Sequence, residues 1–148
     1  MTQPLPSSRR LHPFAGQRLS AAEYVDMLLP PRIHLELLLT GETINPWHLT
    51  SVVGVFNVAT ALAYMHHDRR AIRLYEAISQ LVLGISRAGF DQPGMRERLR
   101  KTFNIADDYL QQQTRPDLLR AVRLVEYQIR HGQATPLVLE PVAADALC

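Results

Sequence analysis

The chain has 148 residues and a mass of 16.8 kDa, a size that suits one domain with one hydrophobic core. Apolar residues make up 47% of it and charged residues 20%, which excludes an intrinsically disordered chain. A formal net charge of +2 excludes a strong overall attraction to nucleic acid or anionic lipid, and a single cysteine, Cys148, excludes an internal disulfide.

The composition changes along the chain and predicts three segments. Residues 1–19 are rich in Pro, Ser and Arg and are expected to form a flexible arm. Residues 20–132 carry helical periodicity and are expected to form the folded domain, and residues 133–148 form a tail. Arg9 and Arg10 are not followed by an apolar run, so no signal peptide is predicted and the expected location is the cytoplasm.

Two short helices are predicted at the start of the domain. Ser20 to Glu23 form a capping box that opens a helix through Leu28. The pair Pro30 and Pro31 is expected to end it, since proline removes a backbone donor and clashes with the preceding turn. A second helix is then predicted from Pro31 to Thr40, stopped by Gly41.

The next stretch is the one around which the rest of the chain is expected to pack. It has no Asp, Glu, Lys or Arg from Thr43 to Met65, so a helix here must be buried on nearly every side. Asn45 is a good N-cap and Pro46 suits the first helical position. The stretch is long enough to cross a membrane, but the polar residues inside it favour a buried core helix, so no membrane is expected.

One strip of this central helix carries small or polar residues at spacings of four, three and four: Thr50, Gly54, Asn57 and Ala61. Such a strip is typical of close helix packing or of a pocket, with Asn57 hydrogen-bonded there. It is equally typical of the one part of the helix that faces water. The sequence leaves both readings open.

Three amphipathic helices are predicted after the central one. The first runs from Arg69 to Ala88 with Asp68 as its cap, the second covers about 95–112, and the third runs from Thr114 to His131. Together these patterns predict an all-α, single-domain bundle of about five to six helices around a buried central helix.

The second of these helices carries a basic cluster formed by Arg96, Arg98, Arg100 and Lys101. Its charge order opposes the helix dipole, because Asp107 and Asp108 follow in the second half. Both acids are predicted on the polar, outward side. The cluster is a candidate contact for phosphate or an acidic partner, but a solvated face with Glu97 and Lys101 paired four apart is preferred.

The last helix carries a similar basic row, Arg120, Arg123 and Arg130. Asp117 and Glu126 lie at salt-bridge spacing from these arginines, which again favours a solvated face.

No catalytic, cofactor or metal site is predicted. His66 and His67 are adjacent on a helix and point about 100° apart, so they cannot chelate one ion. His34 and His48 are lone histidines near apolar surface and are expected at core or boundary positions. We therefore expect a protein that is not an enzyme and needs no cofactor.

Two resemblances to known families can be named on particular residues. The helices around Tyr64, Ala71, Tyr75 and Ile78 resemble a single tetratricopeptide hairpin, which implies an antiparallel helix pair. Ile78 stands where that family has a small residue, and no second repeat follows. Separately, the run from Leu29 to Ile33, Trp47 and the run 57–63 are similar to short helical proteins of proteobacteria, some of which carry a transcriptional-regulator label.

These patterns predict a function in binding. We expect a bacterial regulatory or adaptor protein that acts through protein–protein contacts of a helical surface, with a homodimer as one form. The alternative is a DNA-binding regulator that uses the Arg96–Lys101 cluster, possible but not favoured because acids interleave with the basic residues. A second alternative is a small-molecule sensor with a pocket in the helical core beside Asn57 or His48.

Overall fold

The computed structural model describes residues 17–132, which form five α-helices and no strand. The helices are α1 (Ala21–Thr40), α2 (Pro46–Met65), α3 (Arg69–Ala88), α4 (Met95–Gln111) and α5 (Arg115–Arg130). The predicted all-α bundle is confirmed. The expectations for residues 1–16 and for the tail lie outside the described residues.

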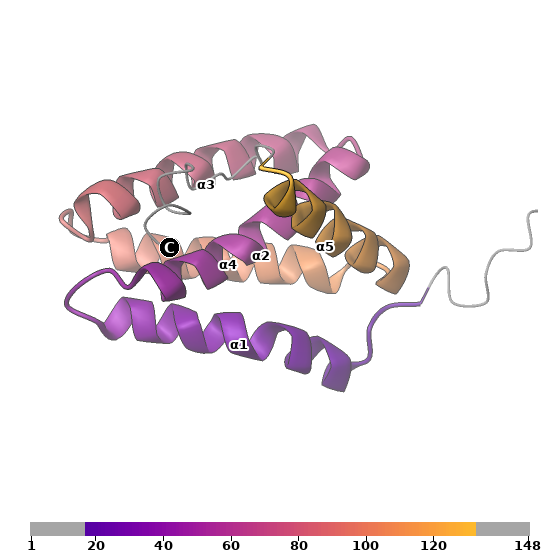
Figure 1. Cartoon of the computed structure of the whole chain (residues 1–148), viewed down its shortest axis with the longest axis horizontal. Coiled ribbons are helices and arrows are strands. Elements are labelled where there is room, and N and C mark those ends of the chain that lie inside the picture. Colours follow the sequence, from indigo (N-terminus) through magenta and orange to yellow (C-terminus); the bar gives the residue numbers. More distant parts are fainter. Residues whose placement is uncertain (1–16, 133–148) are drawn as a thin grey trace, which may run out of the picture.

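Helix α2 is the centre of the bundle, as predicted. It packs against each of the other four helices, with α1 along one side and α3 along the other (Figure 1). Val52, Phe56, Ala59 and Leu62 on α2 are fully buried. This is the one described helix long and apolar enough to cross a membrane, and 61% of its apolar window is buried against its neighbours.

The helix starts follow the predicted capping residues. The Asn45 side chain accepts a hydrogen bond from Trp47 N at 2.9 Å, and Asp68 accepts from Arg70 N and Ala71 N at 3.1 Å. Ser20 accepts from Glu23 N at 3.2 Å. Side-chain acceptors therefore satisfy amides that have no partner within their own helix.

Helix α1 differs from its prediction, because it continues through Pro30 and Pro31 as one helix of 20 residues. The expected break at this pair was wrong. The two prolines remove two backbone donors, but Leu28, on one side of them, and Leu35 and Leu38, on the other, are all buried in the core. Packing of that face outweighs the loss in helix propensity.

Candidate functional site

The outward face of α1 carries an uncovered row of large apolar side chains. Val25, Leu29, Ile33 and Leu37 follow one another at intervals of four and are between 48% and 53% exposed. Residues four apart form a ridge on a helix surface, here about 18 Å long at 1.5 Å per residue. We call these four residues the α1 ridge. Helix α1 is thus apolar on its core face and on its outer face.

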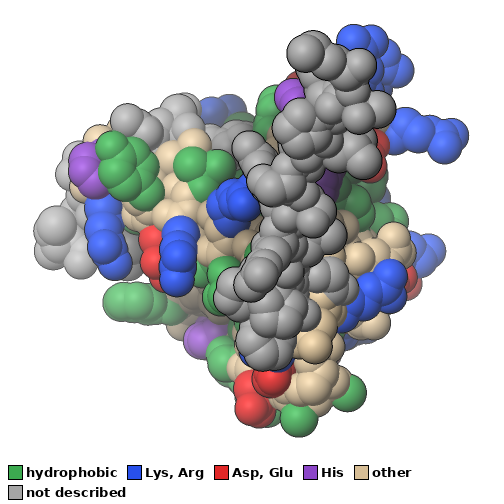
Figure 2. Space-filling model, turned by 90° about the vertical axis from the view of Figure 1, so that its right-hand side faces the viewer, with side chains coloured by type: hydrophobic (Ala, Val, Ile, Leu, Met, Phe, Trp, Pro, Cys, Tyr) green, Lys and Arg blue, Asp and Glu red, His purple; other side chains and the backbone are tan. Residues whose placement is uncertain are grey.

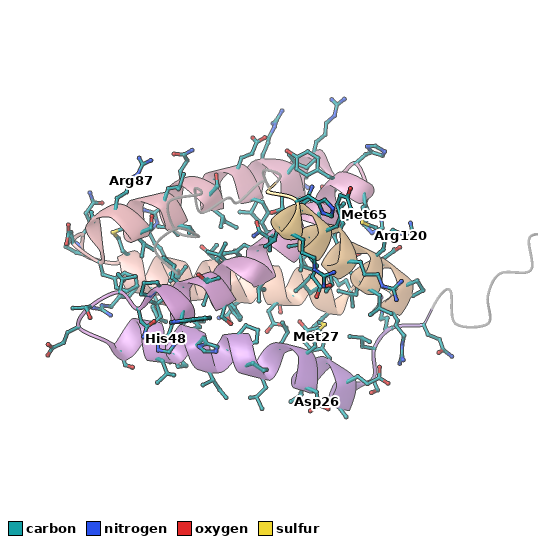
Figure 3. All side chains as sticks on the ribbon, in the orientation of Figure 1. Asp26, Met27, His48, Met65, Arg87 and Arg120 are labelled. Atoms are coloured by element: carbon teal, nitrogen blue, oxygen red, sulfur yellow. The ribbon has the colours of Figure 1, made fainter. Side chains whose placement is uncertain are left out.

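Acidic side chains accompany the α1 ridge. Figure 3 shows Asp26 on the side of α1 that points away from the other helices, and Met27 on the side toward them. Asp26 forms no ion pair with any described residue, and Glu36 is exposed next to the ridge. Helix α1 has three acids, Glu23, Asp26 and Glu36, against one base, Arg32, so its side chains sum to −2.

Asp107 holds the middle of α1 against α4. Its carboxylate forms an ion pair with Arg32 and accepts a hydrogen bond from the Tyr24 hydroxyl, and Gln111 Nε2 lies 3.3 Å from Asp107 Oδ1. The Arg32 guanidinium also lies over the Phe103 ring, 5.2 Å from its centroid. The Asp107 side chain is only 12% exposed. Its prediction as an outward, solvated residue was wrong, because α1 covers this side of α4 and supplies both polar partners.

This contact changes the acidity of Tyr24. Burial raises the pKa of its hydroxyl above the ordinary value, and the hydrogen bond to Asp107 and the negative charge of that carboxylate raise it further. The phenol therefore keeps its proton and acts as a donor to Asp107.

The end of α1 is held by two members of the predicted basic cluster. Arg96 Nη1 donates to the backbone oxygens of Leu39 and Gly41 at 2.5 and 3.2 Å, which satisfies carbonyls at the C-terminus of α1. Arg100 Nη2 lies 3.0 Å from Glu36 Oε2. This tertiary contact explains a base at the start of α4 that the helix dipole disfavours.

The other two members of the cluster differ from each other. Lys101 Nζ lies 4.0 Å from Glu97 Oε1, the predicted pair four residues apart. Arg98 is exposed and has no ion pair or hydrogen bond from its side chain within residues 17–132. Three of the four basic residues are therefore engaged within the chain, and the cluster's role as a phosphate or acidic-partner contact stays a prediction.

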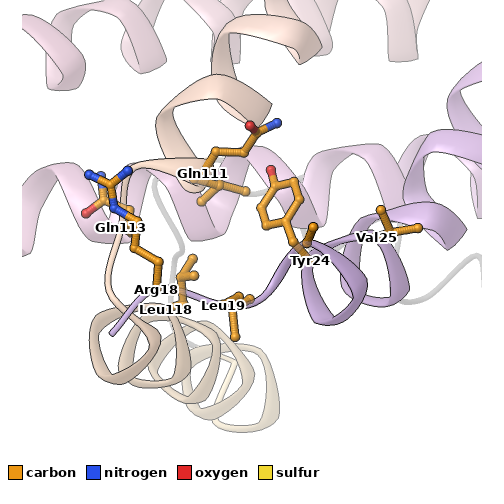
Figure 4. A pocket seen from close by; sticks show the side chains of 9 residues that line it. Arg18, Leu19, Tyr24, Val25, Gln111, Gln113 and Leu118 are labelled. Carbon is orange, nitrogen blue, oxygen red and sulfur yellow. The ribbon is translucent and has the colours of Figure 1, made fainter. Parts of the chain in front are cut away.

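The start of α1 is tied to the start of α5. Arg115 forms an ion pair with Glu23, and its backbone N donates to Gln17 O at 2.7 Å. Beside this contact is a surface cavity of about 410 Å³ between α1, α4 and α5 (Figure 4). Tyr24, Gln111 and Leu118 line it. Neither Asn57 nor His48 lines this cavity, and the sensor hypothesis stays a prediction.

Helix α5 has an outward face of the opposite charge to α1. Leu119 and Tyr127 are 49% and 51% exposed, and the arginines of the predicted basic row are exposed with them. Arg120, Arg123 and Arg130 form no ion pair with Asp117 or Glu126, and Asp117 Oδ2 lies 3.4 Å from His66 Nε2. Four arginines against two acids give α5 a sum of +2. On the side of the molecule in Figure 2, basic and hydrophobic side chains are interspersed.

The predicted strip on α2 runs from the surface into the core. Thr50 is exposed, Gly54 is half-buried with open space where a Cβ would lie, and Asn57 and Ala61 are each 4% exposed. Asn57 Oδ1 is buried and has no hydrogen-bond partner among the described residues. The role of this strip as a packing surface or a pocket wall stays a prediction.

Two histidines that the sequence treated as separate lie together. His34 Nδ1 of α1 and His48 Nδ1 of α2 are 2.8 Å apart, and Figure 3 shows His48 between these two helices. One nitrogen must donate and the other accept, so the pair adds a polar contact between α1 and α2. In the part of the chain that the structure describes, no three His, Cys, Asp or Glu residues are grouped to hold a metal ion.

Comparisons with known proteins do not place the chain in a family: no protein-family model, no curated protein and no solved structure matches it. Helices α2 and α3 do form an antiparallel pair joined by a short turn (Figure 1). The resemblance to short proteobacterial helical proteins stays a prediction.

Proposed function

We propose that this protein is a non-enzymatic bacterial regulatory or adaptor protein that acts through protein–protein contacts of the α1 ridge. The observation that supports this most is the ridge itself: four large apolar side chains, each about half exposed, in one continuous row. Scattered apolar residues are normal on a protein surface, but a contiguous row is a feature of binding surfaces.

The anchoring of α1 supports the same proposal. Asp107 holds its middle, Arg96 caps its end, and Arg115 holds its beginning. A helix fixed at three points presents its outer face in one conformation, which lowers the entropy lost on binding. A partner would add an amphipathic helix or a similar apolar surface to the ridge.

In-cell photo-cross-linking tests this function. A benzophenone amino acid in place of Ile33 on the ridge should capture a protein, and mass spectrometry of the adduct should identify it. The control places the same group at Glu76, an exposed position on the outer side of α3. An adduct at position 33 and none at position 76 is the expected result. No adduct at position 33, or equal yields at both positions, would contradict the proposal.

A further inference from the structure

The surface cavity at the start of α1, the end of α4 and the start of α5 has the size of a small-molecule site (Figure 4). Its volume of about 410 Å³ falls within the range of about 300 to 1,000 Å³ that is usual for such sites. Leu110 and Leu118 line it and are 1% and 2% exposed, so the cavity reaches down to the hydrophobic core. An apolar group placed there would leave water and contact apolar side chains.

Three polar side chains in the wall of the cavity are held by other parts of the chain. The Tyr24 hydroxyl and Gln111 Nε2 both contact the Asp107 carboxylate. Gln113 Nε2 donates to Tyr109 O at 3.0 Å. Side chains that are already fixed lose little entropy when a ligand enters, so the cavity is largely pre-formed.

Among the described residues that line the cavity, Arg18 alone is charged. Its side chain forms no ion pair and no hydrogen bond within residues 17–132. Figure 4 shows Arg18 and Tyr24 on opposite sides of the cavity, with Leu118 between them. Ala21, the first residue of α1, also lines the cavity, and the amides at a helix start attract negative charge. The cavity therefore combines an apolar floor with a positively charged rim.

We propose that this cavity binds a small organic acid, with its apolar ring or chain against Leu110 and Leu118 and its carboxylate on the Arg18 guanidinium. A guanidinium holds a carboxylate through two parallel, charge-assisted hydrogen bonds, which a neutral ligand cannot form. Such a ligand differs in chemical class from the protein partner of the α1 ridge, so either proposal can fail without the other. Val25 belongs to both the cavity and the α1 ridge, so a bound acid would lie beside that partner.

A protein NMR titration tests this site with a matched pair of probes, 2-naphthoate and its neutral analogue 2-naphthamide. Both carry the same apolar rings, and only the first is an anion. We expect 2-naphthoate to bind with a dissociation constant of about 1 mM or below and to shift the backbone amide signals of Tyr24, Gln111 and Leu118. The amide should bind about fivefold more weakly, a modest factor because Arg18 is exposed and water screens its charge.

Two variants at exposed positions locate the binding. Arg18→Gln should remove the preference for the anion, whereas Arg69→Gln, at an exposed arginine that starts α3, should leave it unchanged. Ala21→Trp should fill the cavity and weaken both probes at least about tenfold. Circular dichroism of each variant checks that the helices are intact.

Several results would overturn the proposal. One is the absence of shifts at these amides with 2-naphthoate up to about 10 mM, and another is equal affinity of the wild type for the two probes. An unchanged preference for the anion in Arg18→Gln, or unchanged binding of 2-naphthoate to Ala21→Trp, would overturn it as well.

Discussion

Asp107 is the residue on which the attachment of α1 to α4 depends. It is 12% exposed in its side chain and has two partners on α1, Arg32 and Tyr24. Asp107→Ala leaves a guanidinium and a phenol without their acceptor, and we expect the free energy of unfolding to fall by about 2 to 3 kcal/mol. The Arg32 side chain is 40% exposed, so water screens its charge and the loss is smaller than for a fully buried ion pair.

The adjacent Asp108 provides the control for this prediction. Asp108 is exposed, so Asp108→Ala should change stability by no more than about 0.5 kcal/mol. Urea denaturation of both variants measures the difference. Equal losses would show that Asp107 does not hold the two helices together.

The raised pKa of Tyr24 predicts that the free energy of unfolding falls at alkaline pH. Its pKa is raised in the folded state by burial and by Asp107, so above about pH 10 the folded protein keeps a proton that the unfolded chain has lost. This contribution is complete below that pH, and stability should fall as the pH rises. Burial raises the pKa of Tyr75 and Tyr109 as well, so they should add to the same trend.

The variant Tyr24→Phe isolates one part of that trend. Denaturant unfolding from about pH 9 to about pH 11 should show a shallower fall for the variant, by at most about 1.4 kcal/mol per pH unit for one proton. Identical slopes for variant and wild type would mean that the Tyr24 hydroxyl is not held by Asp107.

At the scale of elements, α1 shows how core packing competes with the low helix propensity of proline. Pro30 lies inside the helix and is exposed, so its ring contributes little to the core. Pro30→Ala restores a backbone donor within α1 and removes a strong helix breaker. Loss of proline also gives the unfolded chain more conformational freedom, which offsets part of this gain. We therefore expect the free energy of unfolding to rise by about 1 kcal/mol.

Thermal unfolding followed by circular dichroism measures this effect, with Pro93→Ala in the turn before α4 as the comparison. Pro93 lies outside any helix, so its replacement should not stabilise the protein. A loss of stability for Pro30→Ala would indicate that α1 needs the local shape that proline imposes.

The elements that the sequence predicted well are those whose signals are local. Helix α2 is an uncharged run that starts with Pro46, directly after the cap Asn45. Asp68 lies at the start of α3 and Gly89 at its end. A cap or a periodic stripe depends on neighbours within a few residues, so these features can be read from a single sequence. The low helix propensity of proline predicted a break in α1 that does not occur. Burial of Leu28, Leu35 and Leu38 keeps the helix continuous, and this burial is a tertiary effect.

The polar contacts between helices could not be predicted from the sequence, because their partners lie far apart along the chain. Asp107 meets Arg32 across 75 positions, and His34 meets His48 between two helices. Arg96 looked misplaced on its own helix because the carbonyls that it binds belong to α1. The α1 ridge was not predicted, because the expected break at Pro30 divided its four residues between two short helices. Continuity of α1 is therefore what turns four scattered residues into one surface.

At the scale of the whole molecule, the contacts of the Arg96–Lys101 cluster within the chain predict weak binding to DNA. Arg96, Arg100 and Lys101 already have partners within the chain, so this cluster has little capacity for phosphates. We expect fluorescence anisotropy of a labelled duplex to show no tight binding that collapses between low salt and about 200 mM. Steep, salt-dependent binding that disappears when all four basic residues become Gln would instead support a DNA-binding regulator.

The central claim concerns the outer face of α1, and Ile33 lies within its ridge. In-cell photo-cross-linking from position 33, repeated with Leu29→Glu and Leu37→Glu in the same chain, tests it most directly, because buried, unpaired carboxylates within the ridge would oppose association. The account predicts an adduct when the rest of the ridge is unchanged and no adduct when the two carboxylates are present, with the helices of both proteins intact by circular dichroism. Equal adduct yields from the two proteins, or no adduct from either, would contradict it.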